Sequence, residues 1–243
     1  SNRTIGLSEN NFDFLNKLNI TKSLKKEIWV CSIMKLYTET KNQKFSKIFE
    51  LNNEDKKKKI LYMIENSKII KLMVNKIKQI KSISIKNKEK IYSISTSGLL
   101  KSVKFNNNVS KYNLVIICTG YKSSLIKSIF NNEMIENSYK ESAVTAILNH
   151  SSSKNNIVRQ IFLKNAIFAL LPISNTKTSI VWSVKHDMLK KNDLFLKKRI
   201  ILYTKNYLKN VKFTTNLEYK DLNFLIRNKY YLDRILLFGD ALH

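Results

Sequence analysis

Residues 234–243 read RILLFGDALH, a run of apolar residues that ends in Gly239 and Asp240. The pattern predicts a buried strand, a tight turn and the first residues of a helix. Glycine lets the backbone turn sharply and lets a ligand approach closely. An aspartate at this place can accept hydrogen bonds from ligand hydroxyls, and a helix start favours anionic groups. The pattern therefore suits a polyol phosphate, although a plain turn or a helix cap explains the same residues.

The length and the two ends of the chain indicate an internal fragment that forms one large domain or two small ones. The chain has 243 residues, begins with Ser1 and stops within the predicted strand, turn and helix start. The cysteines, Cys31 and Cys118, form neither a disulfide framework nor a metal pattern, which favours a reducing compartment. The three histidines have no metal-ligand spacing, so no metal site is expected. No apolar run approaches the roughly 18 residues of a membrane-spanning helix.

The charge of the chain is strongly basic, with a formal net charge of +26. Only five of its 44 basic residues are arginine, which is the residue that phosphate and base-edge recognition favours. Lysine, asparagine and isoleucine are all frequent, and they share A/T-rich codons. We therefore expect a solvated surface shaped by genomic composition and no nucleic-acid partner. A membrane surface remains the alternative use of the lysines.

Helical and strand-like segments alternate in the first half of the chain. Residues 7–20 have helical spacing of apolar residues with Ser8 as the cap, and residues 65–77 form a second helix with Asn66 or Ser67 as its cap. Short strands are predicted within 28–50 and at 80–85, 91–95 and 100–105, with a charged loop at 52–59. The uninterrupted run LVIIC at 114–118 predicts a strand of a parallel sheet that is buried on both faces.

The texture changes after about residue 139. Four longer strands joined by polar turns are predicted at 141–150, 157–163, 165–173 and 178–184, which is typical of an antiparallel sheet. A helix over 189–209 and the strand of RILLF follow. The fold class is therefore α/β with an α+β insertion, in which a Rossmann-like layer is interleaved with an antiparallel sheet.

Four motifs in a fixed order carry a family resemblance. They are RTIGLS (3–8), YMIENSKIIKLM (62–73), NAIFALLPISNTKTSIVWSV (165–184) and RILLFGDALH. In this order and with these gaps they resemble the FAD-dependent hydroxylases of ubiquinone biosynthesis, which are flavin monooxygenases with the p-hydroxybenzoate hydroxylase fold. The resemblance implies an FAD-binding domain at 1–27, 60–130 and 231–243, within one α/β layer. It implies a substrate domain at 28–59 and 139–230.

The resemblance also implies roles for individual residues. Asp240 and Gly239 are expected at the ribityl chain of FAD, and Arg3 and Gly120 are expected at the same cofactor. No catalytic side chain is assigned, because the cofactor carries the chemistry.

Two residues of the predicted antiparallel sheet are assigned to the substrate site. Pro172 is expected at a turn near the flavin ring, with a simple strand stop as the alternative. Trp182 is expected in the sheet core or in the wall of the substrate site.

One motif of the family is altered. The family's GADGxxSxxR falls after LVIIC, where this chain has CTGYKSSLIK at 118–127. Aligned directly, Gly120 takes the place of the aspartate, Tyr121 that of the second glycine and Lys127 that of the arginine. In related hydroxylases the aspartate supports the chemistry of the reduced nicotinamide, so either NAD(P)H or a separate electron donor is expected.

The expected function is that of an aromatic ring hydroxylase that uses FAD and O2 on a polyprenylated phenol of ubiquinone biosynthesis. The expected location is cytoplasmic, with peripheral contact to the inner membrane and with other ubiquinone-biosynthesis proteins as partners. The fragment by itself is expected to be inactive. Two alternatives stay open: another flavin monooxygenase or reductase of the superfamily, and a basic binding protein without enzymatic activity.

Overall fold

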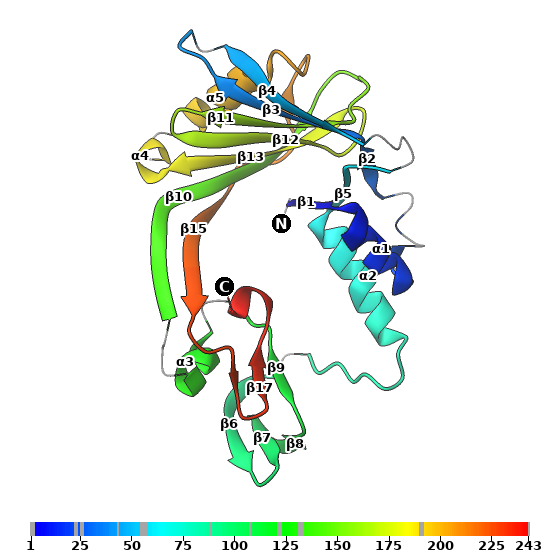
Figure 1. The fold of residues 1–243 in the computed structure, drawn as a ribbon, viewed down its shortest axis with the longest axis vertical. Helices are drawn as coiled ribbons and strands as arrows, with labels where there is room; N and C mark the ends of the chain where they lie inside the picture. Colours follow the sequence, from blue (N-terminus) through cyan, green and yellow to red (C-terminus); the bar gives the residue numbers. More distant parts are fainter. Residues whose placement is uncertain are drawn as a thin grey trace. The chain divides into compact units, whose positions relative to one another are not determined.

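The computed structural model describes residues 3–21, 24, 27–42, 44–53, 58–87, 89–106, 108–120, 123–130, 134–189 and 192–242. Strands hold 47% of these residues and helices 22%, so mixed sheets dominate the fold. The chain forms two compact units (Figure 1). Unit 1 comprises residues 1–83 and 140–221, and unit 2 comprises residues 84–139 and 222–243. The chain passes between the units more than once, so the two units are interleaved.

The first part of unit 1 is a small antiparallel sheet with two helices. Its elements are β1 (Thr4–Leu7), α1 (Glu9–Lys17), β2 (Trp29–Cys31), β5 (Leu61–Glu65) and α2 (Asn66–Lys78), and the strand order is β1-β5-β2. Ser8 caps α1 as predicted, with its Oγ accepting a hydrogen bond from the Asn11 amide at 3.4 Å. The predicted caps of α2 are wrong, because Glu65 holds the N-cap position and its side chain makes no capping hydrogen bond.

The second part of unit 1 is an eight-stranded sheet with the order β14-β10-β13-β12-β11-β3-β4, in which β15 pairs with β10. Its strands are β3 (Ile33–Glu39), β4 (Phe45–Asn52), β10 (Met134–Asn149), β11 (Ile157–Leu163), β12 (Ala166–Pro172), β13 (Lys177–Lys185), β14 (Lys212–Phe213) and β15 (Glu218–Arg227). The four predicted long strands are confirmed as neighbours β10-β13-β12-β11 with antiparallel pairing. The parallel pair β11–β3 is the exception. Strands β10 and β15 continue from unit 1 into unit 2.

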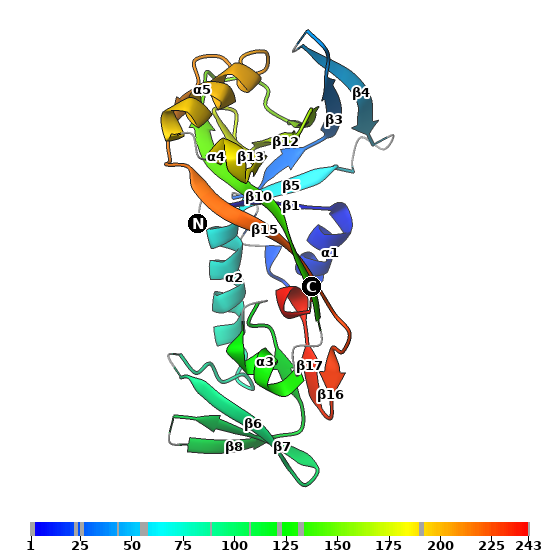
Figure 2. The same ribbon diagram turned by 90° about the vertical axis from the view of Figure 1, so that its left-hand side faces the viewer.

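One face of this sheet is covered by helix α5 (Asp193–Thr204), which follows the short helix α4 (His186–Leu189) (Figure 2). Asn192 caps α5, because its Oδ1 accepts a hydrogen bond from the Phe195 amide at 3.0 Å. The helix is shorter than the predicted 189–209. Leu196 and Ile200 of α5 are buried with Trp182 and other sheet residues in the largest hydrophobic core.

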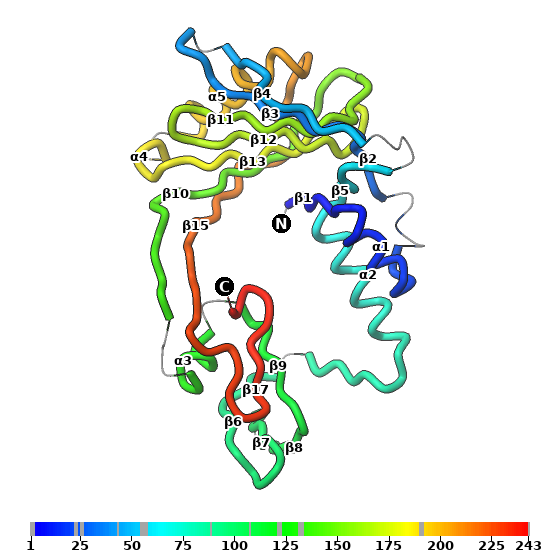
Figure 3. Tube along the Cα trace, in the orientation of Figure 1, coloured from blue at the N-terminus to red at the C-terminus, as the bar shows by residue number. Residues whose placement is uncertain are grey.

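Unit 2 contains two small sheets. Strands β6 (Ile91–Ser97), β7 (Leu100–Phe105) and β8 (Asn108–Tyr112) form an antiparallel meander. Strands β9 (Val115–Ile117), β16 (Tyr231–Leu232) and β17 (Ile235–Leu237) form the other sheet, and the 3₁₀ turn η2 (Gly239–Ala241) follows β17 (Figure 3). Helix α3 (Ser124–Phe130) packs on β9 and β17 through Ile126 and Phe130.

The prediction that residues 114–118 and 234–238 belong to one sheet is confirmed, since β9 and β17 are parallel neighbours. The predicted burial of β9 on both faces is wrong, because Ile116 is 53% exposed. In the part of the chain that the structure describes, only the face toward α3 is covered. The strand predicted at 80–85 is also wrong, since these residues are turn and irregular backbone.

The single α/β layer predicted for the cofactor side is divided. Strands β1 and β5 belong to one three-stranded sheet, and β9 and β17 belong to another. None of the described strands bridges these two sheets. The predicted boundaries of an FAD-binding and a substrate domain stay a prediction.

Candidate functional site

The carboxyl edge of the β9–β17 pair is the first part of the candidate site. Ile117 and Leu237 are register partners, and the Phe238 amide donates a hydrogen bond to the Ile117 carbonyl at 3.0 Å. Both strands therefore end at one edge, where residues 118–120 and 238–240 leave the sheet. In open α/β sheets, ligands bind in the crevice outside the carboxyl ends of parallel strands.

Two glycines give this edge its conformation. Gly120 has φ of +78° and Gly239 has φ of +63°, a region that side chains other than glycine rarely adopt. A Cβ atom added at either position would meet no heavy atom within 4 Å. The backbone at both strand ends therefore borders open space that a ligand can enter.

Asp240 lies on the η2 turn directly after Gly239 and is exposed. Across the described ranges, no side-chain hydrogen bond or ion pair engages its carboxylate. The predicted helix start is a 3₁₀ turn in the structure. Asp240 thus presents acceptor oxygens at the edge where the sequence placed a ligand.

Arg227 holds this turn in place and was missed by the sequence analysis. Its Nε donates to the Ala241 carbonyl at 2.8 Å, and the residue is only 5% exposed. Burial lowers the pKa of Arg227. Ala241 itself is fully buried in the core with Ile117 and Ile235. The sequence feature that could have pointed to Arg227 is the rarity of arginine in this chain.

The altered GADG motif fits the backbone in a second register. If Gly120 matches the second glycine of the motif, its positive φ is explained, and Ser123 matches the motif serine. Thr119 then takes the place of the aspartate. The positive φ of Gly120 explains why this position holds glycine, and the alignment of the motif stays a prediction. Tyr121 lies outside the described residues. The motif's aspartate is missing in both registers.

Arg3 lies in unit 1, where the first two motifs of the resemblance meet. Its carbonyl accepts a hydrogen bond from the Asn66 amide at 2.8 Å, and the adjacent Thr4 is the register partner of Glu65. Arg3 is exposed. Gly120, Gly239 and Asp240 belong to unit 2, so a common cofactor for all four residues stays a prediction.

Pro172 and Trp182 occupy different environments in the large sheet. Pro172 is buried at the end of β12, opposite Thr178, where the β12–β13 turn begins. Trp182 is 2% exposed and packs edge-on against Phe168 at 6.2 Å and Tyr203 at 5.6 Å between ring centroids. Its position on the face toward α5 favours a core role over a substrate-wall role.

The opposite face of the sheet carries small and apolar side chains. Strand alternation places Val181 and Ser183 there, and their register partners include Ala143, Thr145 and Ala169. The Ser183 Oγ accepts a hydrogen bond from the Ile167 amide at 2.8 Å. These five neighbouring positions are uncharged; four of them are half-buried and Thr145 is buried. We call it the open face.

A cavity of about 250 Å³ lies beside the β12–β13 turn. Its lining includes Trp29, Met63 and Ile173, together with Lys68 and its partners Glu27 and Glu65. The Lys68 Nζ is 2.6 Å from Glu27 and 3.2 Å from Glu65. The hydrogen bond that Lys68 donates to Glu27 is the largest cause that raises the pKa of Lys68. No sequence pattern marks Trp29 or Glu27 as cavity residues, because they line the cavity only through the packing of β2 and the residues before it.

Among the residues with described positions, the remaining reactive side chains form no catalytic constellation. His150, near a predicted turn, is buried rather than solvated, and its Nε2 lies 2.9 Å from the Thr178 hydroxyl. Burial raises the pKa of Cys31 to about 12, whereas Cys118 is exposed. No group of three potential metal ligands occurs within the described residues. In the same ranges, no helix has the length and apolar character needed to cross a membrane.

Solved structures of monooxygenases superpose on this chain. No protein-family profile matches the chain. A probable FAD-dependent monooxygenase from Pseudomonas aeruginosa superposes with a TM-score of 0.80 at 12% identity, covering all of this chain and 70% of that protein. The p-nitrophenol 4-monooxygenase of Pseudomonas putida superposes with a TM-score of 0.75 at 12% identity, again over all of this chain and 64% of that protein. The chain therefore has the fold of these monooxygenases.

The sequence is similar to the ubiquinone biosynthesis monooxygenase COQ6. The zebrafish protein (Danio rerio) is 24% identical over 149 residues, which is 57% of this chain and 31% of the relative. The mouse protein (Mus musculus) is 37% identical over 75 residues, which is 30% of this chain and 16% of the relative. The aligned part thus spans less than a third of these curated relatives. Fold and sequence together support membership of the flavin hydroxylase family.

Proposed function

We propose that the chain is part of an FAD-dependent ring hydroxylase that acts on a polyprenylated phenol of ubiquinone biosynthesis. The observation that carries the proposal is the carboxyl edge of β9–β17, where two glycines with positive φ border open space beside exposed Asp240. These residues fit a flavin, because a polyol chain can approach glycine backbone closely and its hydroxyls can donate to a carboxylate. When bound, FAD would supply the redox chemistry and the activation of O2 that no side chain provides.

The residues of the chain would bind and orient the cofactor. Asp240 accepts hydrogen bonds from the ribityl hydroxyls, while Gly239 and Gly120 leave room for the ligand. Arg227 positions Asp240 indirectly, since it anchors the following residue Ala241. Arg3 is proposed as a further residue that binds the cofactor. The proposed FAD-binding domain comprises 1–27, 60–130 and 231–243, and the proposed substrate domain comprises 28–59 and 139–230.

The open face is proposed as the floor of the substrate site. Its small, uncharged side chains suit an aromatic ring with an apolar tail, and the names of the curated relatives support the ubiquinone precursor as substrate. Pro172 would shape the turn beside this floor, whereas Trp182 would support the sheet from the α5 side. A peripheral contact with the inner membrane and with other ubiquinone-biosynthesis proteins belongs to the same proposal. The missing motif aspartate supports a separate electron donor over direct use of NAD(P)H.

Replacing Asp240 tests the cofactor assignment. Losing a hydrogen bond to a charged acceptor costs about 1.5–3 kcal/mol, so Asp240→Ala in the full-length protein should weaken FAD binding by about ten- to a hundredfold. Asp240→Asn keeps an acceptor oxygen and should lose less. Asp13→Ala removes an exposed acid from α1 and serves as the matched control. An unchanged FAD dissociation constant in a folded Asp240→Ala protein would make Asp240 a turn residue only and would refute the assignment.

A further inference from the structure

Strand β4 exposes an unusual amount of apolar surface for an edge strand. It is the last strand in the order of the large sheet, so its outer backbone edge has no partner strand in the described residues. Ile48, Phe49 and Leu51 are 55%, 51% and 41% exposed. Contiguous exposed apolar residues on a sheet edge mark an interaction surface or a hazard for aggregation.

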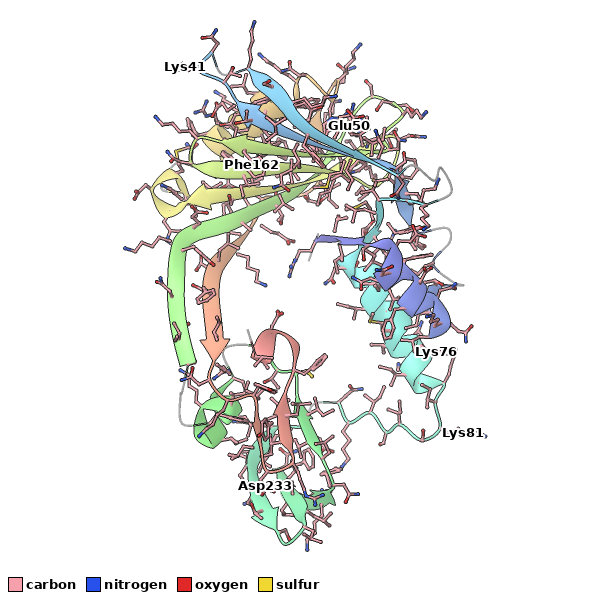
Figure 4. All side chains as sticks on the ribbon, viewed as in Figure 1. Lys41, Glu50, Lys76, Lys81, Phe162 and Asp233 are labelled. Carbon is pink, nitrogen blue, oxygen red and sulfur yellow. The ribbon has the colours of Figure 1, made fainter. Side chains whose placement is uncertain are left out.

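Lysines lie at the hairpin end of this strand and within it. Lys41 and Lys44 lie in the β3–β4 turn and Lys47 lies in β4. Figure 4 shows Lys41 at the tip of the hairpin, extending away from the sheet. Lys164 is close to the same hairpin, since its amide donates to the Glu39 carboxylate at 3.2 Å.

The acid within β4 is already neutralised by lysines. The Glu50 carboxylate lies 2.7 Å from the Lys47 Nζ and 3.3 Å from the Lys35 Nζ. The hydrogen bond from Lys47, followed by those from Asn52 and Lys35, lowers the pKa of Glu50 to about 2. Lys41 and Lys44 therefore remain as a basic group at the hairpin end of the strand that carries the apolar residues. We call residues 41–51 the basic edge.

We infer that the basic edge docks on the surface of an anionic lipid bilayer. Ile48, Phe49 and Leu51 would enter the headgroup region, and Lys41 and Lys44 would meet the anionic headgroups, because surface binding combines buried apolar area with electrostatic attraction. The inference deepens the peripheral location proposed above by naming the contact surface. Its test needs no flavin, so its failure would leave the hydroxylase proposal untouched.

A second copy of the chain is the competing occupant of this edge. Two features of the strand oppose edge-to-edge pairing. The register of β3 and β4 shifts between Leu36 and Tyr37, and the strand contains Lys47 as an edge lysine, which pairs with Glu50 of the same strand. Bulges and edge lysines are devices by which sheets avoid pairing with another chain. A bilayer tolerates both, since it needs no backbone register.

Co-sedimentation of the full chain with vesicles tests the inference. Phosphatidylcholine vesicles that contain phosphatidylserine should bind the chain, and added salt should weaken the binding. Lys41→Glu/Lys44→Glu should weaken it by about tenfold or more, since each lysine near an anionic surface contributes about fivefold. Ile48→Ser/Phe49→Ser should also lower binding, with no change in the circular dichroism spectrum, because both residues are exposed.

Matched variants on α2 control for the large net charge. Lys76→Glu/Lys81→Glu makes the same change of charge in the last turn of α2 and just after the helix (Figure 4). Ile70→Ser/Val74→Ser removes apolar residues that are also exposed on α2. Both should bind vesicles nearly as the unchanged chain does.

Three outcomes would overturn the inference. Equal losses in the basic-edge and α2 variants would assign binding to net charge. Unchanged binding of the basic-edge variants would exclude this surface. The third outcome is a dimer that the chain forms without vesicles and that Ile48→Ser/Phe49→Ser converts to a monomer. This result would assign the edge to contact with a second copy of the chain.

Discussion

Asn155 is expected to stabilise the turn that follows Pro172 more than any exposed asparagine does. It is 4% exposed, and its Nδ2 lies 2.8 Å from the Ser174 carbonyl, 3.2 Å from the Lys177 carbonyl and 2.9 Å from the Thr178 hydroxyl. These partners belong to the β12–β13 turn and to the start of β13. Replacing Asn155 with alanine removes the donors while leaving the buried acceptors in place.

The expected loss follows from the number of donors. An amide nitrogen has two hydrogens, so the three contacts correspond to two full hydrogen bonds of about 1 kcal/mol each. The Ser174 carbonyl also loses its donor, which adds roughly 1 kcal/mol. The Lys177 carbonyl keeps the amides of Ile173 and Ser174 and adds little. Asn155→Ala should therefore lower the free energy of unfolding by about 3 kcal/mol.

Urea unfolding followed by circular dichroism at 25 °C measures this loss. Asn52→Ala is the control, because Asn52 makes a single exposed hydrogen bond to the Glu50 carboxylate at 3.1 Å and should lose less than about 0.5 kcal/mol. Trypsin should also cut after Lys177 faster in Asn155→Ala than in the control. A loss below about 1 kcal/mol for Asn155→Ala would refute the reasoning, since it would mean that water replaces the amide without cost.

Three further predictions concern the β16–β17 hairpin, the thiols and pH. Arg234 has φ of +63° and follows Asp233 at φ of +37°, so the backbone at Arg234 is strained. Arg234→Gly should therefore raise the free energy of unfolding, measured in urea, by roughly 0.5–1 kcal/mol. An unchanged free energy of unfolding would show that Arg234 is not strained. In the native chain Ellman's reagent should modify Cys118 and spare Cys31, because burial raises the pKa of Cys31 to about 12; two reactive thiols would contradict this. The pKa of Glu50 is lowered by its lysine partners to about 2, so its stabilisation is present above pH 4.5 and lost as pH falls toward 2. Between pH 5 and pH 2.5, the free energy of unfolding in urea should fall by less in Glu50→Gln than in the unchanged chain.

Local patterns in the sequence predicted the elements that depend on near neighbours. Ser8 caps α1 because its side chain reaches an amide three residues away, which spacing alone reveals. The four strands after residue 139 follow from apolar alternation between polar turns. The switch from buried apolar runs to longer alternating strands predicted that residues 114–118 and 234–238 share a sheet, and their parallel pairing confirms it.

Other features were decided only by contacts between distant residues. The sheet face on which Trp182 lies depends on the register of β13 and on where α5 packs. His150 follows β10 but is buried, since Asn155 of the loop before β11 and Thr178 of β13 lie against its ring. Ile116 belongs to an apolar run but is exposed, because α3 covers only one face of its sheet. Apolar spacing specifies which residues share a face, whereas only the tertiary packing decides what, if anything, covers that face.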